Sequence, residues 1–144
     1  MKIVLTRVKE ASVKVNNEVV GSIDKGLLLL VGFTEGDSLD TLQYMANKVL
    51  NLRVFDDSNG IMNLSVRDIN GKILSVSQFT LYGDASKGNR PSYSKALNQE
   101  KAKVLYEQFN RLLSKKIEIQ TGIFRTDMDV YSINDGPVTI VLEK

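Results

Sequence analysis

SVSQFTLYGD, residues 75–84, has the alternation of a β-strand and places Gln78 and Thr80 on one face near the strand's end. Two neighbouring polar side chains on one face could line a pocket. Thr80 is a poor candidate for a nucleophile, because a threonine hydroxyl needs a base beside it and the chain has no histidine. Gln78 and Thr80 would be equally ordinary on the solvated side of an antiparallel strand.

NDGPVTI, residues 134–140, places Pro137 directly after a glycine within a β-like region, although the chain has only two prolines. The sequence alone allows two interpretations. In one, residues 134–136 form a hairpin turn and Pro137 begins the next strand. In the other, Gly136 lets the backbone approach a ligand while the proline ring fixes the direction of the carbonyls.

Two further stretches could contribute to a site. GIFRTDMDV contains Phe124 and Met128, which are core residues by default in a strand-rich region. SKGNRP, residues 86–91, is a glycine-containing loop whose Lys87 and Arg90 would suit phosphate contacts. An ordinary mobile loop is the plainer interpretation of this segment.

The absence of certain residue types restricts the chemistry. The chain has no Cys, no His and no Trp, which excludes disulfides, thiol nucleophiles, histidine triads and zinc sites built on Cys or His. No side chain ionises between about pH 5 and 8 without a shift. General base catalysis at neutral pH would therefore need a strongly shifted carboxylate or lysine, or a group that the substrate brings. We expect neither a metal nor a cofactor.

The basic residues are unevenly distributed along the chain. Formal net charge is only +2, but residues 86–116 hold eight basic side chains against two acidic ones. Such a segment suits a surface that meets phosphates, or it is the solvated face of a helix. The chain contains no long apolar run, and its N-terminus does not resemble a signal peptide. We expect a cytoplasmic protein without membrane contact.

Hydrophobic periodicity predicts a single α+β domain over residues 1–144, with two main helices and a largely antiparallel sheet that curls into a barrel. KGLLLLVGFT (25–34) is typical of a central strand buried on both faces. Amphipathic patterns predict helices over 38–50, with Asp37 or Ser38 as the cap, and over 98–115. Other strands are expected over 2–8, 10–16, 18–24, 52–55, 61–65, 71–83, 116–122, 127–133 and 137–143.

Taken together, the motifs resemble those of the D-aminoacyl-tRNA deacylases, also known as D-tyrosyl-tRNA deacylases. The resemblance covers nearly the whole chain and includes RVKEASV, VVGSIDKGLLLLVG, LRVFDD, SQFTLYGD, KGNRPSY and NDGPVTI. SQFTL and NDGPVT, in this order and at this separation, are its most specific part.

The resemblance implies a homodimer in which a cis Gly136-Pro137 step of each subunit reaches into the active site of the other. It implies that Ser77, Gln78, Phe79 and Thr80 surround the scissile ester and orient it without acting as nucleophiles. Substrate binding and chiral selection would then involve Gly136, Pro137, Phe79, Phe124 and Met128, and contacts to tRNA would involve Arg7, Lys87 and Arg90.

The resemblance also implies a mechanism that needs no histidine. The substrate is an activated ester on the terminal adenosine of tRNA, and a ribose hydroxyl of the RNA would assist its hydrolysis. Carbonyls near Gly136 and Pro137 would hold the α-ammonium of the substrate. In that position an L side chain would collide with the backbone and a D side chain would not. A glycyl ester, which has no side chain, would also be accepted. Such discrimination by clash needs a rigid selector.

This chain departs from the family pattern at two positions. It has Thr6 where glutamine is usual and Arg125 where a glycine is usual, so that a charged side chain lies beside the expected pocket. The alternative to an enzyme is a catalytically silent RNA-binding module that uses the basic helix and loop. It predicts salt-sensitive tRNA binding without ester cleavage.

Overall fold

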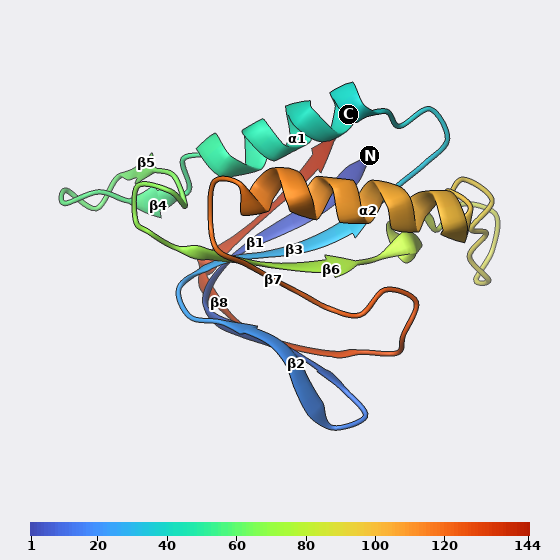
Figure 1. Ribbon diagram of the computed structural model, residues 1–144, viewed down its shortest axis with the longest axis horizontal. Helices are drawn as coiled ribbons and strands as arrows, with labels where there is room; N and C mark the ends of the chain where they lie inside the picture. The colour runs from blue at the N-terminus through green and yellow to red at the C-terminus, as the bar shows by residue number, and fades with distance from the viewer.

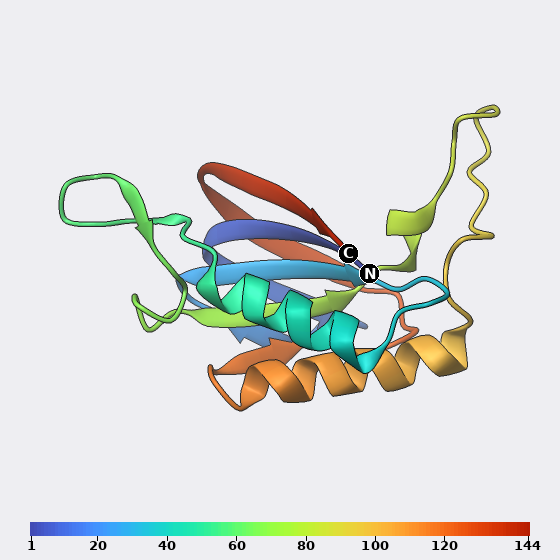
Figure 2. The same ribbon diagram turned by 90° about the horizontal axis from the view of Figure 1, so that it is seen from above.

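The computed structural model describes residues 1–144. A strongly curled sheet is covered on one side by two helices that pack against each other (Figures 1 and 2). The helices are α1 (Leu39–Asn51) and α2 (Gln99–Ser114). The strands are β1 (Lys2–Val15), β2 (Glu18–Ile23), β3 (Gly26–Gly32), β4 (Phe55–Asp56), β5 (Met62–Leu64), β6 (Lys72–Ser77), β7 (Ile119–Thr121) and β8 (Asp129–Glu143).

The sheet has the order β2-β1-β3-β6-β7, and β8 pairs with the remaining side of β1. Most pairs are antiparallel, but β3–β6 and β6–β7 are parallel. The sheet curls so far that β2 also contacts β6 and β7, and Gly21 of β2 has no room for a Cβ because that atom would lie 2.9 Å from the carbonyl oxygen of Thr121. The predicted fold class, an α+β domain with a barrel-like core and two helices, is confirmed.

β3 is the central strand, and its burial on both faces was correctly predicted. Leu27 and Leu29 belong to the main core beneath the helices, whereas Leu28 belongs to a smaller core inside the curl of the sheet. Its apolar run is continuous because a strand between two cores must be apolar on both faces.

The two helices begin at capping residues. Ser38 caps α1 and forms a capping box with Thr41, while the Asn98 side chain accepts a hydrogen bond from the Glu100 amide at the start of α2. Both helices lie within about a residue of their predicted bounds. Asp37, the other predicted cap, instead accepts a 2.5 Å hydrogen bond from the ammonium group of Met1. Neither helix is long and apolar enough to cross a membrane.

Two of the predicted strand divisions are wrong. Residues 2–15 form one strand, because β1 pairs with β3 through its first half and with β2 through its second half. Residues 129–143 also form one strand, because both parts of β8 pair with β1 in the same direction. Thr6 lies opposite Thr139 and Val8 lies opposite Asn134, so residues 135–138 bulge outward. The predicted hairpin over 134–136 is therefore absent.

Candidate functional site

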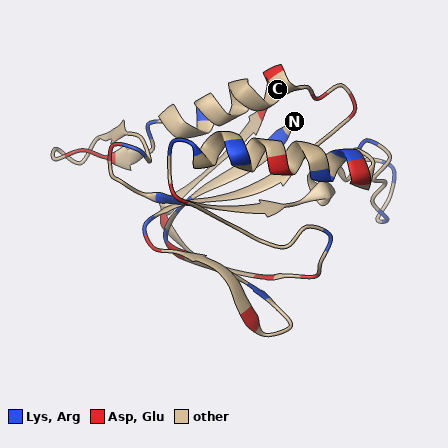
Figure 3. Ribbon diagram, viewed as in Figure 1, with Lys and Arg blue, Asp and Glu red and all other residues tan.

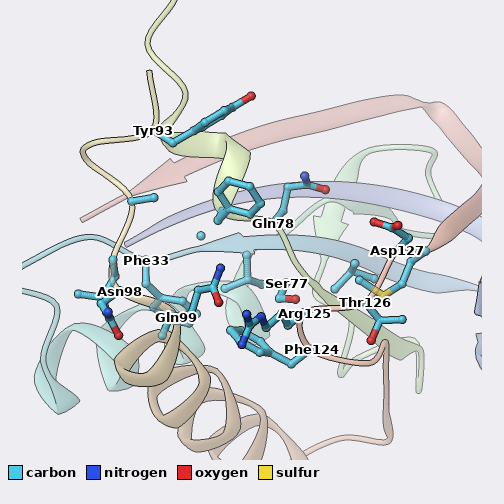
Figure 4. Close-up of a pocket in the computed structure, with 18 of the residues that line it drawn as sticks. Phe33, Ser77, Gln78, Tyr93, Asn98, Gln99, Phe124, Arg125, Thr126 and Asp127 are labelled. Atoms are coloured by element: carbon cyan, nitrogen blue, oxygen red, sulfur yellow. The ribbon is translucent and has the colours of Figure 1, made fainter. Parts of the chain in front are cut away.

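A pocket of about 720 Å³ opens between the end of β6, the start of α2 and the segment that joins β7 to β8 (Figure 4). This volume is in the usual range for small-molecule sites. The lining is mostly apolar, and its charged members are Arg125 and Asp127. Its other residues of interest are Phe33, Ser77, Gln78, Phe79, Tyr93, Asn98, Gln99, Phe124, Thr126 and Met128.

One wall of the pocket is formed where β6 ends at Ser77. The strand predicted over 71–83 stops there, and Phe79–Tyr82 form a turn of 3₁₀ helix instead. The alternation that placed Gln78 and Thr80 on one face of a strand is therefore wrong. Their side chains still meet, because the Gln78 amide donates a hydrogen bond to the Thr80 hydroxyl. Ser77, Gln78 and Phe79 line the pocket, whereas Thr80 is exposed and lies outside it.

The opposite wall comes from the segment between β7 and β8. Phe124 and Met128 are both half-buried: Phe124 packs against the main core and Met128 against the smaller one, and both line the pocket. Phe124 also lies 5.8 Å from the ring of Tyr106, whose hydroxyl donates a 2.7 Å hydrogen bond to the carbonyl of Ser75. Burial raises the pKa of Tyr106. Figure 4 shows Phe124 and Arg125 together on this side of the pocket.

The segment of residues 134–138, which we call the β8 bulge, does not line the pocket of its own chain. Gly136 and Pro137 are exposed, and the peptide bond between them is cis. The Asn134 side chain spans the bulge, because it accepts a 2.9 Å hydrogen bond from the Val138 amide and donates one of 3.0 Å to the Thr139 hydroxyl.

Arg7 holds the β8 bulge from inside the protein. Its Nε donates a 2.9 Å hydrogen bond to the Asp135 carbonyl, and its Nη1 donates one of 2.7 Å to the Val54 carbonyl. The side chain is 8% exposed and also forms ion pairs with Asp56 and Asp135. This placement argues against the tRNA contact predicted for Arg7, because the guanidinium is buried and already engaged.

Lys87 and Arg90 lie in the exposed loop between Asp84 and Ser92, and neither forms an ion pair. Figure 3 shows basic positions in this loop and along α2, where acidic positions also occur. On α2, Lys101 pairs with Glu35 and Lys103 with Glu107. The loop therefore presents its cations more freely than the helix does, which keeps Lys87 and Arg90 as the predicted phosphate contacts.

The pocket contains no recognisable pair of nucleophile and base. No hydrogen bond joins Ser77 to a carboxylate or a lysine, and the Thr80 hydroxyl accepts from an amide. Asp127 is exposed at the pocket surface and forms no ion pair. The arrangement can orient a substrate, but it lacks the side-chain pairs that activate a nucleophile.

Comparisons with known proteins identify the family. The family model described as D-Tyr-tRNA(Tyr) deacylase matches residues 4–143. A D-aminoacyl-tRNA deacylase of an Exiguobacterium species is 54% identical over 145 residues, which covers 100% of this chain and 99% of that protein. The chain belongs to the D-Tyr-tRNA(Tyr) deacylase family. The resemblance inferred from the motifs is confirmed, and so is the predicted enzyme class, a hydrolase that acts on ester bonds.

Other relatives of this deacylase family member agree in length and shape. A D-aminoacyl-tRNA deacylase of Exiguobacterium sibiricum is also 54% identical and is covered completely. The solved structure of a c-Myc DNA unwinding element binding protein has a TM-score of 0.95 and 42% identity over 100% of this chain and 99% of that one. A probable eukaryotic D-amino acid tRNA deacylase, 17% identical, has a TM-score of 0.82 over 98% of this chain and 97% of that one, and shares the fold.

Sequence reasoning missed several residues that line the pocket. Tyr93 closes the KGNRPSY motif, but nothing in its local sequence indicates that it lies beside Phe79. Asn98 and Gln99 were recognised only as the start of a helix. Their place at the pocket follows from the direction in which α2 crosses the sheet, and that direction has no local signal.

Proposed function

We propose that this protein hydrolyses the ester bond of D-aminoacyl-tRNA and releases free D-amino acid and tRNA, as a quality-control step of translation in the cytoplasm. Mischarged glycyl-tRNA is a second expected substrate. Family membership supports the reaction class. The observation that carries the mechanism is a pocket of suitable size in which the Ser77 hydroxyl has no hydrogen bond to a carboxylate or a lysine.

A ribose hydroxyl next to the ester supplies the missing catalytic group in this proposal. Water adds to the acyl carbon, the bond between that carbon and the ribose oxygen breaks, and one proton of the water ends on the ribose oxygen. The neighbouring hydroxyl assists these proton transfers. Ser77, Gln78 and Phe79 hold the ester in place, and such positioning can contribute several kcal/mol to the reduction of the barrier.

Chiral selection falls to the β8 bulge of a second subunit. Gly136 and Pro137 are exposed at the surface of the chain and do not reach its own pocket, so an active role requires another copy. In the proposed homodimer, their carbonyls enter the partner's pocket and hold the α-ammonium of the substrate. An L side chain then collides with backbone, a D side chain points to open space, and glycine fits.

The exposed edge of the sheet supports this dimer. β8 pairs only with β1, so the other edge of a 15-residue strand is free. Four of its exposed side chains are large apolar residues: Val130, Tyr131, Ile133 and Val141. A long exposed edge strand with apolar side chains is usually covered in a stable protein.

The first test compares D-Tyr-tRNA with L-Tyr-tRNA. We expect rapid release of tyrosine from the D-form and little from the L-form. Equal hydrolysis of both, or of neither, would contradict the proposal. A D-Tyr-tRNA whose terminal ribose lacks the hydroxyl next to the ester should resist hydrolysis. If it reacts at the normal rate, the ribose does not take part and another catalytic group must exist.

The second test concerns the shared site. Gly136→Ala disables the bulge, and Ser77→Phe fills the pocket. In a dimer with shared sites, a mixed pair keeps one intact pocket facing one intact bulge. An equal mixture of the two inactive variants should therefore recover about a quarter of wild-type activity through random pairing of subunits. Equally mixed, correctly folded variants that stay inactive would argue that each chain acts alone.

The alternative remains an RNA-binding module without catalysis. It predicts tRNA binding that weakens steeply with salt, together with an unchanged ester. Family membership and the pocket favour the hydrolase, and the assay with D-Tyr-tRNA separates the two directly.

A further inference from the structure

We infer that Tyr93 and Phe79 form a stacking platform for the nucleobase that precedes the terminal adenosine of the bound RNA. This inference rests on the proposed function, since it concerns how the same site holds its RNA. It adds a subsite at the rim of the pocket and assigns Tyr93 to it as a specificity residue.

Two large aromatic rings are exposed side by side at the rim. The ring centroids of Phe79 and Tyr93 lie 5.2 Å apart, with an angle of 65° between the ring planes. The two residues are 59% and 41% exposed, although both also line the pocket. At this angle the two rings meet edge to face, so that one ring braces the other, and an exposed ring face beside a site is a surface on which unstacked bases of single-stranded RNA bind.

Local backbone contacts fix the position of Tyr93. Asp84 and Ser92 exchange two backbone hydrogen bonds of 2.8 and 2.9 Å, which close the loop between them. Hydrogen bonds from Ser86 lower the pKa of Asp84 and brace the start of that loop. Gly83 lies beneath the ring, since a Cβ there would be 2.9 Å from Cε1 of Tyr93. A platform with a fixed backbone loses less entropy when a base stacks on it.

The direction of the RNA follows from the size and opening of the pocket. A pocket of about 720 Å³ holds a ligand of small-molecule size, such as one nucleoside with its aminoacyl group. The preceding nucleotide must therefore lie at the rim. Figure 4 shows Tyr93 on the side opposite Phe124 and Arg125, with its hydroxyl pointing away from the pocket. The ring rather than the hydroxyl is thus the group available beside the opening.

The charge of the same loop suits a nucleotide. Lys87 and Arg90 lie between the two ends that Asp84 and Ser92 join, and both are exposed without an ion pair. Cations next to aromatic rings are the usual combination in sites for single-stranded nucleic acid, because the cations contact phosphates while the rings contact bases. No acidic side chain lies between residues 85 and 99 to offset them.

The test compares two short substrates, one without and one with the nucleotides that precede the terminal adenosine. One is D-tyrosyl-adenosine, and the other is the same ester on the trinucleotide cytidine-cytidine-adenosine. We expect Tyr93→Ala to lower the ratio of kcat/KM between the trinucleotide and the nucleoside about tenfold, mainly through KM, as base–aromatic stacking predicts. Tyr93→Phe should keep the wild-type ratio, because the ring is retained.

Tyr44→Ala is the matched control, since Tyr44 is 46% exposed on α1 and does not line the pocket. It should leave the ratio unchanged. If Tyr93→Ala also leaves the ratio unchanged, because kcat/KM stays the same or falls equally for both substrates, the platform is refuted.

A binding measurement separates this inference from the proposed function. The chain has no Trp, so Tyr93→Trp introduces a single tryptophan at the rim, whose fluorescence can be excited separately from that of the remaining tyrosines. The trinucleotide cytidine-cytidine-adenosine without an aminoacyl group should quench the tryptophan fluorescence, and adenosine alone should not. A wild-type protein that hydrolyses neither ester would contradict the proposed function only, and this titration would still decide the platform. Fluorescence that does not respond to the trinucleotide would overturn the inference.

Discussion

The β8 bulge and the pocket wall of residues 77–82 both present exposed groups, but they are held in different ways. The bulge backbone is fixed by hydrogen bonds, from buried Arg7 on the inside and to the side chain of Asn134 at the surface. The wall ends in a single 3₁₀ turn, Phe79–Tyr82, whose outer side chains Phe79 and Thr80 are exposed and contact other side chains, those of Tyr93 and Gln78. A selector that works by clash needs a rigid backbone, whereas side chains that hold a substrate tolerate more freedom. The comparison predicts that a small substitution in the bulge changes activity more than truncation of a side chain in the wall does.

Gly136→Ala should have the largest effect. The φ angle of Gly136 is 130°, and an added Cβ would lie 2.9 Å from both Nη2 of Arg7 and Cγ2 of Val138. The bulge would have to shift, and a displacement of about 1 Å at a catalytic site can cost on the order of 10²-fold in rate. We expect a loss of that size in kcat/KM for D-Tyr-tRNA. Gly60→Ala is the matched control, since Gly60 also has a positive φ but nothing lies within 4 Å of the position that an added Cβ would take.

Arg7→Met should have the second-largest effect, a loss of stability. The variant keeps an apolar stem but leaves the carbonyls of Val54 and Asp135 without their donor, and a buried acceptor without a partner costs about 1–3 kcal/mol. We expect the free energy of unfolding, measured by urea denaturation, to fall by about 2 kcal/mol. Arg53→Met, at an exposed arginine, should change it little. An equal, small change in both variants would show that Arg7 does not secure the bulge.

Tyr82 is the buried residue of the 3₁₀ turn in the wall, and its phenol makes the stability of the fold depend on pH. Burial raises the pKa of its phenol to about 12, with smaller effects from Asp37 and Glu143. The unfolded chain releases this proton near pH 10, so the folded state binds more protons between about pH 10 and 12 and stability falls as the pH rises through that range. Tyr82→Phe should reduce this alkaline loss in thermal unfolding curves. An unchanged slope would mean that the phenol is not protected by the fold.

The sequence predicted the elements with strong periodicity and missed those that depend on distant partners. The helices, the Ser38 cap of the first one and the doubly buried β3 were correct because Ser38, the amphipathic patterns and the apolar run of residues 27–31 carry local signals. The β8 bulge was missed because a single residue of β1 opposes four residues of β8, and Pro137 resembles the start of a new strand. The position of Arg7 could not be predicted, since its partners Val54 and Asp135 come from other parts of the chain.

Prediction of the site shows the same division. Ser77, Gln78, Phe79, Phe124 and Met128 were found through motifs, and all five line the pocket. Tyr93 was missed because the loop that carries it closes through a backbone bridge between Asp84 and Ser92, which no side-chain pattern indicates. Motifs therefore pointed to residues that line the pocket, while contacts between separate segments determine its rim.

Thr80→Ala should have the smallest effect, although Thr80 stands in the most specific motif of the chain. Its hydroxyl accepts a hydrogen bond from Gln78 at the surface and does not line the pocket, so its loss removes one exposed hydrogen bond worth about 0.5–1.5 kcal/mol. We expect the single-turnover rate constant for hydrolysis of D-Tyr-tRNA to fall less than about tenfold. Loss of a true nucleophile costs on the order of 10⁴-fold or more. A loss of that size would mean that the wall, and not only the bulge, must be held rigidly and that the hydroxyl enters the reaction.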